Sequence, residues 1–296
     1  MPQDNSEYQQ KIREFEALCS ELGIRAARVA GRADSDSAEL SLTERTKLIG
    51  EEEAQKRVAQ FESLLAEMES EGVRGNDIPA GLHFDAGLCY CVLEQWEKAS
   101  GQFALCAEKR PEYSPALHYW GVALVKKYDQ TNDAIWLEKG LGRYEQALAV
   151  RSDLPEVLAD WGLALWKKYH VTRDIRQLEL AHEKFGMATA LKSDLYRAFS
   201  NWGGCLATLF RATGERNYIE LAHEKCSRAL EIVPEGVNPY FNPACVLGLM
   251  GRKEAMLEAL GKAIDLGPEY RKFAREDTDL EAYWDDPDFL ALVGEG

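Results

Sequence analysis

The sequence is poor in positive charge and has no long apolar run. It contains 35 Lys and Arg residues against 50 Asp and Glu residues, which gives a net charge of −15. Nucleic acids are bound mainly through Lys and Arg patches that displace counterions, so this balance argues against a nucleic-acid partner. No apolar stretch reaches the ~18–20 residues that a membrane-spanning helix needs. The polar, acidic N-terminus does not resemble a signal peptide, and we expect a cytoplasmic protein.

The sequence also lacks the short motifs of common enzymes. It has no GxGxxG followed by an acidic residue, no GxxxxGKS/T and no GxSxG, so nucleotide binding and hydrolase chemistry have no support. His182 and His223 occupy equivalent places one repeat apart, and that spacing does not bring two ligands together on one helix. His83, His118 and His170 are isolated. We therefore expect no enzyme activity, no cofactor and no metal site.

Cysteine is present without a pairing pattern. The seven cysteines are odd in number and include no CxxC pair, which argues against a disulfide framework and against a zinc site. Several stand where the chain pattern calls for a small or medium apolar residue. Cys226, for example, occupies the place that Tyr144 and Phe185 hold in two equivalent segments. We expect reduced cysteines inside the core.

What the sequence does have is a long internal repeat. The pair Trp-Gly recurs at a step of 41 residues, at Trp120, Trp161 and Trp202. Leucine keeps the same step at Leu124, Leu165 and Leu206, and alanine at Ala147, Ala188 and Ala229. A fixed period of this length is typical of a repeat solenoid. The three units occupy residues 114–154, 155–195 and 196–236, and 34-residue units flank them at 80–113 and 237–270.

These units resemble the tetratricopeptide repeat (TPR) family. The 34-residue unit at 80–113 has Gly87, Ala99, Phe103 and Pro111 at offsets 8, 20, 24 and 32. The resemblance implies an all-α, right-handed superhelical solenoid of antiparallel helix pairs, because one helix pair cannot bury its apolar face alone. Glycine or alanine at offset 8 allows the two helices of a unit to approach closely.

The three middle units depart from the family pattern by seven extra residues between offsets 11 and 20. Because the downstream pattern resumes in phase, we expect the first helix to be longer at its end and the second at its start. Dividing seven residues between two helices adds about 5 Å to each at the helical rise. We expect these ends to form a ridge along one edge of the array.

The flanking segments carry most of the acidity, with a net charge of −7 in residues 1–79 and −5 in residues 271–296. In the first segment we expect a helix at 6–22, a linker at 23–40, and a helix from a capping box at 41–44 to about Ser70. Its predicted apolar face is Val58, Phe61, Leu65 and Met68. The last segment resembles the closing segment of many bacterial TPR arrays. We expect it to cap the last repeat with Phe273, Leu280, Trp284 and Phe289.

The resemblance also implies where a partner binds. In TPR proteins the first helix of each unit lines the concave face, mainly at offsets 2, 5, 6, 9, 12 and 13. In this sequence these offsets hold His118, Tyr119, Val122, Lys126, Asp160, Leu163, Trp166, Lys167, Arg197, Asn201, Thr208, Phe241 and Asn242. Aromatic, apolar and a few basic groups suit an extended or helical peptide with apolar anchors and acidic groups. Some TPR proteins bind the acidic C-terminal tails of chaperones through a Lys and an Asn at offsets 5 and 9 of one unit. This pair is absent from the first three units here, which argues against a chaperone-tail adaptor.

Two functions remain open at this point. The first is a non-enzymatic scaffold or adaptor that binds a protein or peptide partner in the concave groove, in assembly of a larger complex. The alternative is a structural protein that self-associates, as a homodimer for example, through the N-terminal helices or an edge of the array. The apolar stripe of the N-terminal helices persists over too few heptads to favour a coiled coil.

Overall fold

The computed structural model describes residues 10, 13, 49–70, 78–233 and 239–294. Within these residues all regular structure is helical, which confirms the predicted all-α fold class. The chain forms two compact bodies, which we call the first body (residues 1–152) and the second body (residues 153–296). The predicted domain limits at residues 79 and 270 stay predictions. No helix of the described residues is both long and apolar enough to cross a membrane.

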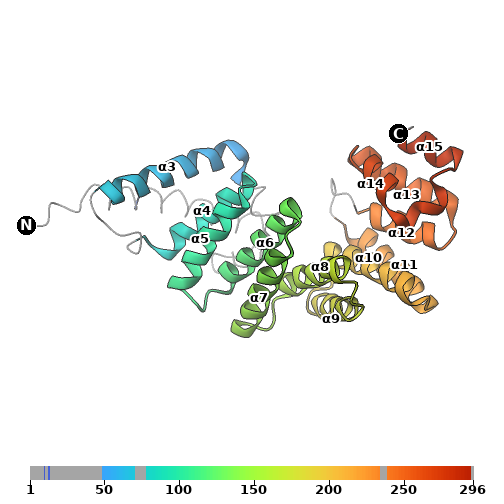
Figure 1. Cartoon of the computed structure of the whole chain (residues 1–296), viewed down its shortest axis with the longest axis horizontal. Coiled ribbons are helices and arrows are strands. Elements are labelled where there is room, and N and C mark those ends of the chain that lie inside the picture. Colours follow the sequence, from blue (N-terminus) through green and yellow to red (C-terminus); the bar gives the residue numbers. More distant parts are fainter. Residues whose placement is uncertain (1–9, 11–12, 14–48, 71–77, 234–238, 295–296) are drawn as a thin grey trace, which may run out of the picture. The chain divides into compact units, whose positions relative to one another are not determined.

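From residue 49 on, the described part of the first body contains one helix followed by two helix pairs (Figure 1). Along the chain, each of these helices packs against the next. Their bounds are α3 (Glu51–Ser70), α4 (Ala80–Val92), α5 (Trp96–Lys109), α6 (Ser114–Thr131) and α7 (Ala134–Val150).

The second body contains three helix pairs and a closing segment. The pairs are α8 (Pro155–Thr172) with α9 (Arg176–Leu191), α10 (Tyr196–Thr213) with α11 (Arg216–Ile232), and α12 (Phe241–Leu249) with α13 (Lys253–Leu266). The closing segment, which we call the cap, comprises α14 (Tyr270–Glu276), the 3₁₀ helix η3 (Thr278–Tyr283) and α15 (Pro287–Val293). Helix α10 packs against α8, α9, α11 and α12, so it is the central helix of this body (Figure 1).

Helix α3 covers the first repeat. Its buried face includes Phe61 and Leu64, which are 0% and 2% exposed, and the Phe61 ring lies 6.1 Å from the His83 ring of α4. Leu64 therefore takes the place predicted for Leu65, which is only half-buried. The helix predicted to run from residue 41 is also interrupted, because Gly50 adopts a left-handed φ of 71° directly before α3. Apart from residues 10 and 13, which are helical, the predicted helix 6–22 lies outside the described residues, as do the linker 23–40 and the capping box.

In the first four helix pairs, α4–α5 to α10–α11, glycine lets the two helices approach closely, whereas α12 has Ala244 at the same offset. A Cβ atom on Gly87 would lie 2.6 Å from the Phe103 ring, and one on Gly121 would lie 2.6 Å from the Tyr144 ring. Carbon atoms pack favourably only at about 3.5–4.0 Å, so neither position has room for a larger residue. The predicted role of offset 8 as the point of close approach is therefore confirmed by the packing.

The third and fourth pairs use the same contact. A Cβ on Gly162 would meet the Phe185 ring at 3.0 Å, and one on Gly203 would collide with the Cys226 sulfur. Cys226 is 2% exposed and takes the place of an aromatic ring, as predicted. Burial raises the pKa of its thiol to about 12. All the described cysteines are buried free thiols, and Cys19 lies outside the described residues.

The extra residues of the middle units lengthen both helices of each pair. The first helices α6, α8 and α10 have 18 residues, against 13 in α4. The second helices α7, α9 and α11 have 17, 16 and 17 residues, against 14 in α5. The first helix therefore takes the larger share, about 7 Å at the helical rise, rather than an equal one.

The cap completes the core of the second body. Leu280 and Phe289 are 0% and 1% exposed and share a cluster with Met256 and Leu260 of α13, while Trp284 packs at its edge. Phe273 was predicted to join them but is 46% exposed, since its ring contacts Phe241 and Tyr270 at the surface instead.

The glycine contact leads to a stability prediction. We expect Gly121→Ala to lower the free energy of unfolding by about 1–3 kcal/mol, because the new methyl group overpacks Tyr144 and approaches the backbone oxygen of Gly140 at 3.2 Å. Gly142→Ala is the matched control in α7. No atom lies within 4 Å of its Cβ, so it should stabilise by about 0.5–1 kcal/mol through helix propensity. Urea unfolding of the unmodified protein, Gly121→Ala and Gly142→Ala measures both effects. Equal changes in the free energy of unfolding for the two variants would contradict the packing argument.

Candidate functional site

In the first body, two of the four predicted binding residues are buried. Tyr119 is 1% exposed, and its ring packs 5.6 Å from Phe84 and 5.9 Å from Phe103. His118 is 7% exposed and stacks on the Tyr119 ring. Both residues belong to the core, so their assignment to a binding surface is corrected. Val122 is half-buried and Lys126 is exposed.

In the second body, five of the predicted residues converge on one cavity. It has a volume of about 300 Å³ and lies among α8, α10, α12 and α14. We call it the α10–α12 pocket. Its lining includes the predicted Leu163, Arg197, Asn201, Phe241 and Asn242, and adds Tyr196, Ser200, Pro239 and Tyr270.

Two sets of contacts fix the walls of the α10–α12 pocket. The Asn242 side-chain amide donates to the backbone oxygen of Ser200 at 2.9 Å and to its hydroxyl at 3.1 Å, which ties α12 to α10. The Phe241 and Tyr270 rings lie 5.2 Å apart, and burial raises the pKa of Tyr270. Among the described lining residues, Arg197 alone is charged. The pocket therefore offers an apolar wall, amide donors and acceptors, and one cation.

Trp166 has a structural role that the sequence reasoning missed. Its indole N–H donates to the Thr208 hydroxyl at 3.0 Å, and its ring lies over Gly204, where a Cβ would collide with it. The same hydroxyl donates to the Gly204 carbonyl at 3.0 Å. Trp166 and Thr208 therefore join α8 to α10 rather than standing free as partner anchors.

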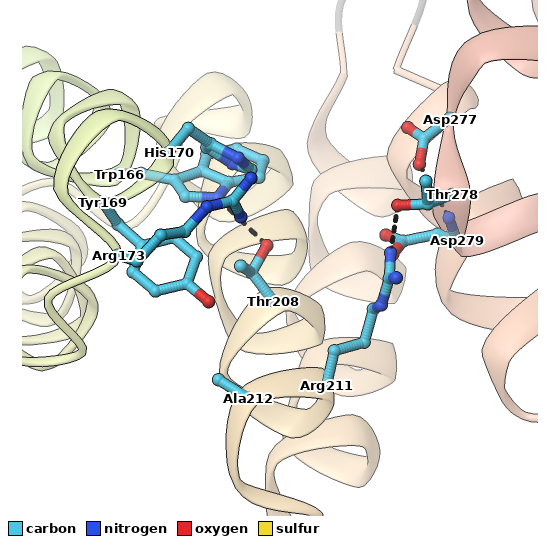
Figure 2. A pocket seen from close by; sticks show the side chains of 10 residues that line it. All are labelled: Trp166, Tyr169, His170, Arg173, Thr208, Arg211, Ala212, Asp277, Thr278 and Asp279. Carbon is cyan, nitrogen blue, oxygen red and sulfur yellow. Dashed lines mark hydrogen bonds and ion pairs between the residues drawn. The ribbon is translucent and has the colours of Figure 1, made fainter.

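A second cavity, which we call the cap pocket, has a volume of about 350 Å³. Figure 2 shows the end of α8 facing the cap, with the end of α10 between them. Its lining residues are Trp166, Tyr169, His170, Arg173, Thr208, Arg211, Ala212, Asp277, Thr278 and Asp279. Of these, only Trp166 and Thr208 were predicted as site residues. The remaining two predicted residues, Asp160 and Lys167, are half-buried on α8 and line neither pocket.

Charged groups of both signs line the cap pocket. Arg211 pairs with Asp279 at 2.7 Å and donates to the Thr278 hydroxyl (Figure 2). Burial, with the nearby Asp277 carboxylate, raises the pKa of Asp279, although Arg211 opposes this effect. The His170 imidazole has a lowered pKa, chiefly because of burial and then because of Arg173.

Cys245, Asp277 and Asp279 bring a thiol and two carboxylates within 4.8 Å of one another. A metal ion would require the thiolate form. Burial and the adjacent carboxylates raise the pKa of Cys245, and its thiol donates to the Asp277 carboxylate at 3.6 Å. Arg211 already pairs with Asp279. These groups therefore fit a hydrogen-bonded junction between α12 and the cap better than a metal site.

Comparison with known proteins defines the fold. No protein-family model and no curated protein sequence matches the chain. Among solved structures, TTC0263, a thermophilic TPR protein of Thermus thermophilus, superposes with a TM-score of 0.53 at 16% identity, covering 70% of this chain and 97% of that one. The chain has the TPR fold.

A second solved structure covers more of the sequence. A chain of the APC/C hetero-tetramer Cut9–Hcn1 has a TM-score of 0.63 at 12% identity, covering 94% of this chain and 48% of that one. The similarity at such low identity concerns the fold. It agrees with the helix-pair architecture that the repeats predict.

The Trp166–Thr208 bond can be tested by removing the hydroxyl group alone. We expect Thr208→Val to lower the free energy of unfolding by about 1 kcal/mol, because the indole N–H and the Gly204 carbonyl each lose a partner. Thr208→Ser keeps the hydroxyl and should cost less. Urea unfolding of the full chain distinguishes the two variants. A Thr208→Val protein as stable as the unmodified one would show that the bond does not join these helices.

Proposed function

We propose that the protein is a non-enzymatic scaffold or adaptor that binds a peptide segment of a protein partner in the α10–α12 pocket. The observation that carries this proposal is the convergence of Leu163, Arg197, Asn201, Phe241 and Asn242 on one cavity. These residues come from three first helices of successive repeats. A pocket built across repeats suits a segment that runs along them.

The pocket chemistry indicates the kind of segment. Leu163, Phe241 and Tyr270 provide an apolar surface for one anchor side chain. Arg197 is exposed and can pair with an acidic group of the same segment. The Asn201 amide can both donate to and accept from a peptide backbone. An apolar residue near an acidic residue is the simplest match.

Self-association through the N-terminal helices or an edge of the array stays a prediction, and the structure describes only α3 of the N-terminal helices. The apolar face of α3 is buried within the chain, and α3 packs on α4. It follows that this face is not free to pair with a second copy. Homodimer formation stays a prediction without a supporting contact.

The proposal is tested by reversing one charge in the pocket. Full-length protein with Arg197→Glu should recover at least about tenfold less of a partner that co-purifies with the unmodified protein from the native host, because an acidic segment would then be repelled. The matched control, Arg216→Glu, makes the same charge change at the start of α11, where no residue lines the pocket.

The partner is identified by mass spectrometry before the comparison, so the same protein is measured in each case. Loss with Arg197→Glu and retention with Arg216→Glu supports the pocket. Equal recovery of every partner by both variants would remove the α10–α12 pocket as the binding site.

A further inference from the structure

The cap pocket includes residues that an ordinary 34-residue unit does not have. Helix α4 of the short unit ends at Val92, and the equivalent positions are Lys167 in α8 and Thr208 in α10. Tyr169, His170, Arg173 and Arg211 all lie beyond those positions. The lengthening of the middle units therefore supplies part of the lining of this cavity, which is separate from the α10–α12 pocket.

Arg173 holds a backbone conformation for which the neighbouring repeats use other residues. It ends α8 in the left-handed region with φ 56°, where α6 has Asn132 at 54° and α10 has Gly214 at 76°. Asn and Gly adopt this conformation readily, whereas a long side chain is strained there. Backbone strain at a residue that lines a cavity motivates a hypothesis that its side chain has a function there.

The Arg173 guanidinium is available to a ligand. It lies over the Tyr169 ring, 5.7 Å from the ring centroid. Within the described residues, no carboxylate forms an ion pair with it. In Figure 2, Arg173 and His170 extend from the α8 side of the pocket, next to the rings of Trp166 and Tyr169. This wall combines a cation with flat apolar surfaces.

The α8 wall carries one cationic side chain, Arg173, and no carboxylate among its described lining residues. Burial, together with the nearby Arg173, Lys167 and Arg211, lowers the pKa of His170 on the same wall, and Asp277 opposes them. The carboxylates of the opposite wall are already engaged. Asp279 pairs with Arg211 at 2.7 Å, and Asp277 accepts the Asp279 amide N–H at 2.9 Å and faces the Cys245 thiol at 3.6 Å.

We propose that the cap pocket binds a carboxylate group, with its oxygens on Arg173 and the adjoining part of the ligand against the Trp166 and Tyr169 rings. A single negative charge fits better than the two of a phosphate, because Asp277 and Asp279 form the opposite wall. A cavity of this volume holds a small acid or one end of a peptide. The carboxylate can belong to a chain terminus or to an acidic side chain.

Three small probes separate these sources. N-acetylphenylalanine carries a terminal carboxylate, N-acetylphenylalaninamide is its neutral counterpart, and N-acetylisoglutamine carries a side-chain carboxylate. Each is titrated into the full chain while the indole N–H resonance of Trp166 and the Nε–H resonance of Arg173 are followed by NMR. We expect at least one acid to shift both resonances with saturation and the amide to shift neither.

Arg173→Asn is the decisive variant, since the chain itself uses Asn132 at the equivalent position. It should unfold at the same temperature as the unmodified protein or higher, and it should bind the acid about tenfold more weakly or worse. Arg176→Asn is the matched control, because Arg176 is exposed, pairs with Asp174 and does not line the pocket. It should leave the affinity unchanged.

Three results would overturn the proposal. They are the absence of any shift with either acid, equal shifts with acid and amide, and equal affinity of the Arg173→Asn and unmodified proteins. Binding of N-acetylphenylalanine would indicate a chain-terminal carboxylate as the ligand, and binding of N-acetylisoglutamine would indicate an acidic side chain. Because Arg197 is not altered, failure here leaves the α10–α12 pocket untested, and failure of the partner experiment leaves the cap pocket standing.

Discussion

The contact between a glycine of one helix and a bulky side chain of the next sets the geometry of the repeats. Three pairs use a ring against glycine, at Phe103, Tyr144 and Phe185, and a fourth uses the Cys226 sulfur. Because a glycine places no side chain between the helices, the ring fills the space and the core is closely packed. The space beside each glycine therefore determines how large the side chain of the second helix can be at that contact.

This packing places the candidate sites. Helix α10 presents its buried side to α11 through Gly203, and other sides to α8 and α12. Arg197 and Asn201 lie near its start and line the α10–α12 pocket, whereas Arg211 lies near its end and lines the cap pocket. One well-packed helix therefore carries residues of both cavities. Rigid elements of this kind hold binding groups more accurately than loops do.

The repeats made the helix pairs, their glycine contacts and the lengthened helices predictable from the sequence, because period and phase depend only on local packing. The partners of individual side chains were not predictable. Tyr119 has an offset typical of the concave face, but its ring gains more from burial against Phe84 and Phe103. Trp166 satisfies its N–H on Thr208, 42 residues later. The cap pocket depends on where the cap folds back, which no repeat encodes.

A double-mutant cycle at Gly162 and Phe185 measures the central contact most directly, since the three atoms nearest to a Cβ on Gly162 all belong to that ring. The free energy of unfolding is determined for the unmodified protein, Gly162→Ala, Phe185→Leu and the double variant. If the ring sets the helix approach, the alanine should cost less beside leucine, with a coupling energy of about 1 kcal/mol or more. If the changes in the free energy of unfolding of Gly162→Ala and Phe185→Leu simply add in the double variant, the ring does not set the helix approach.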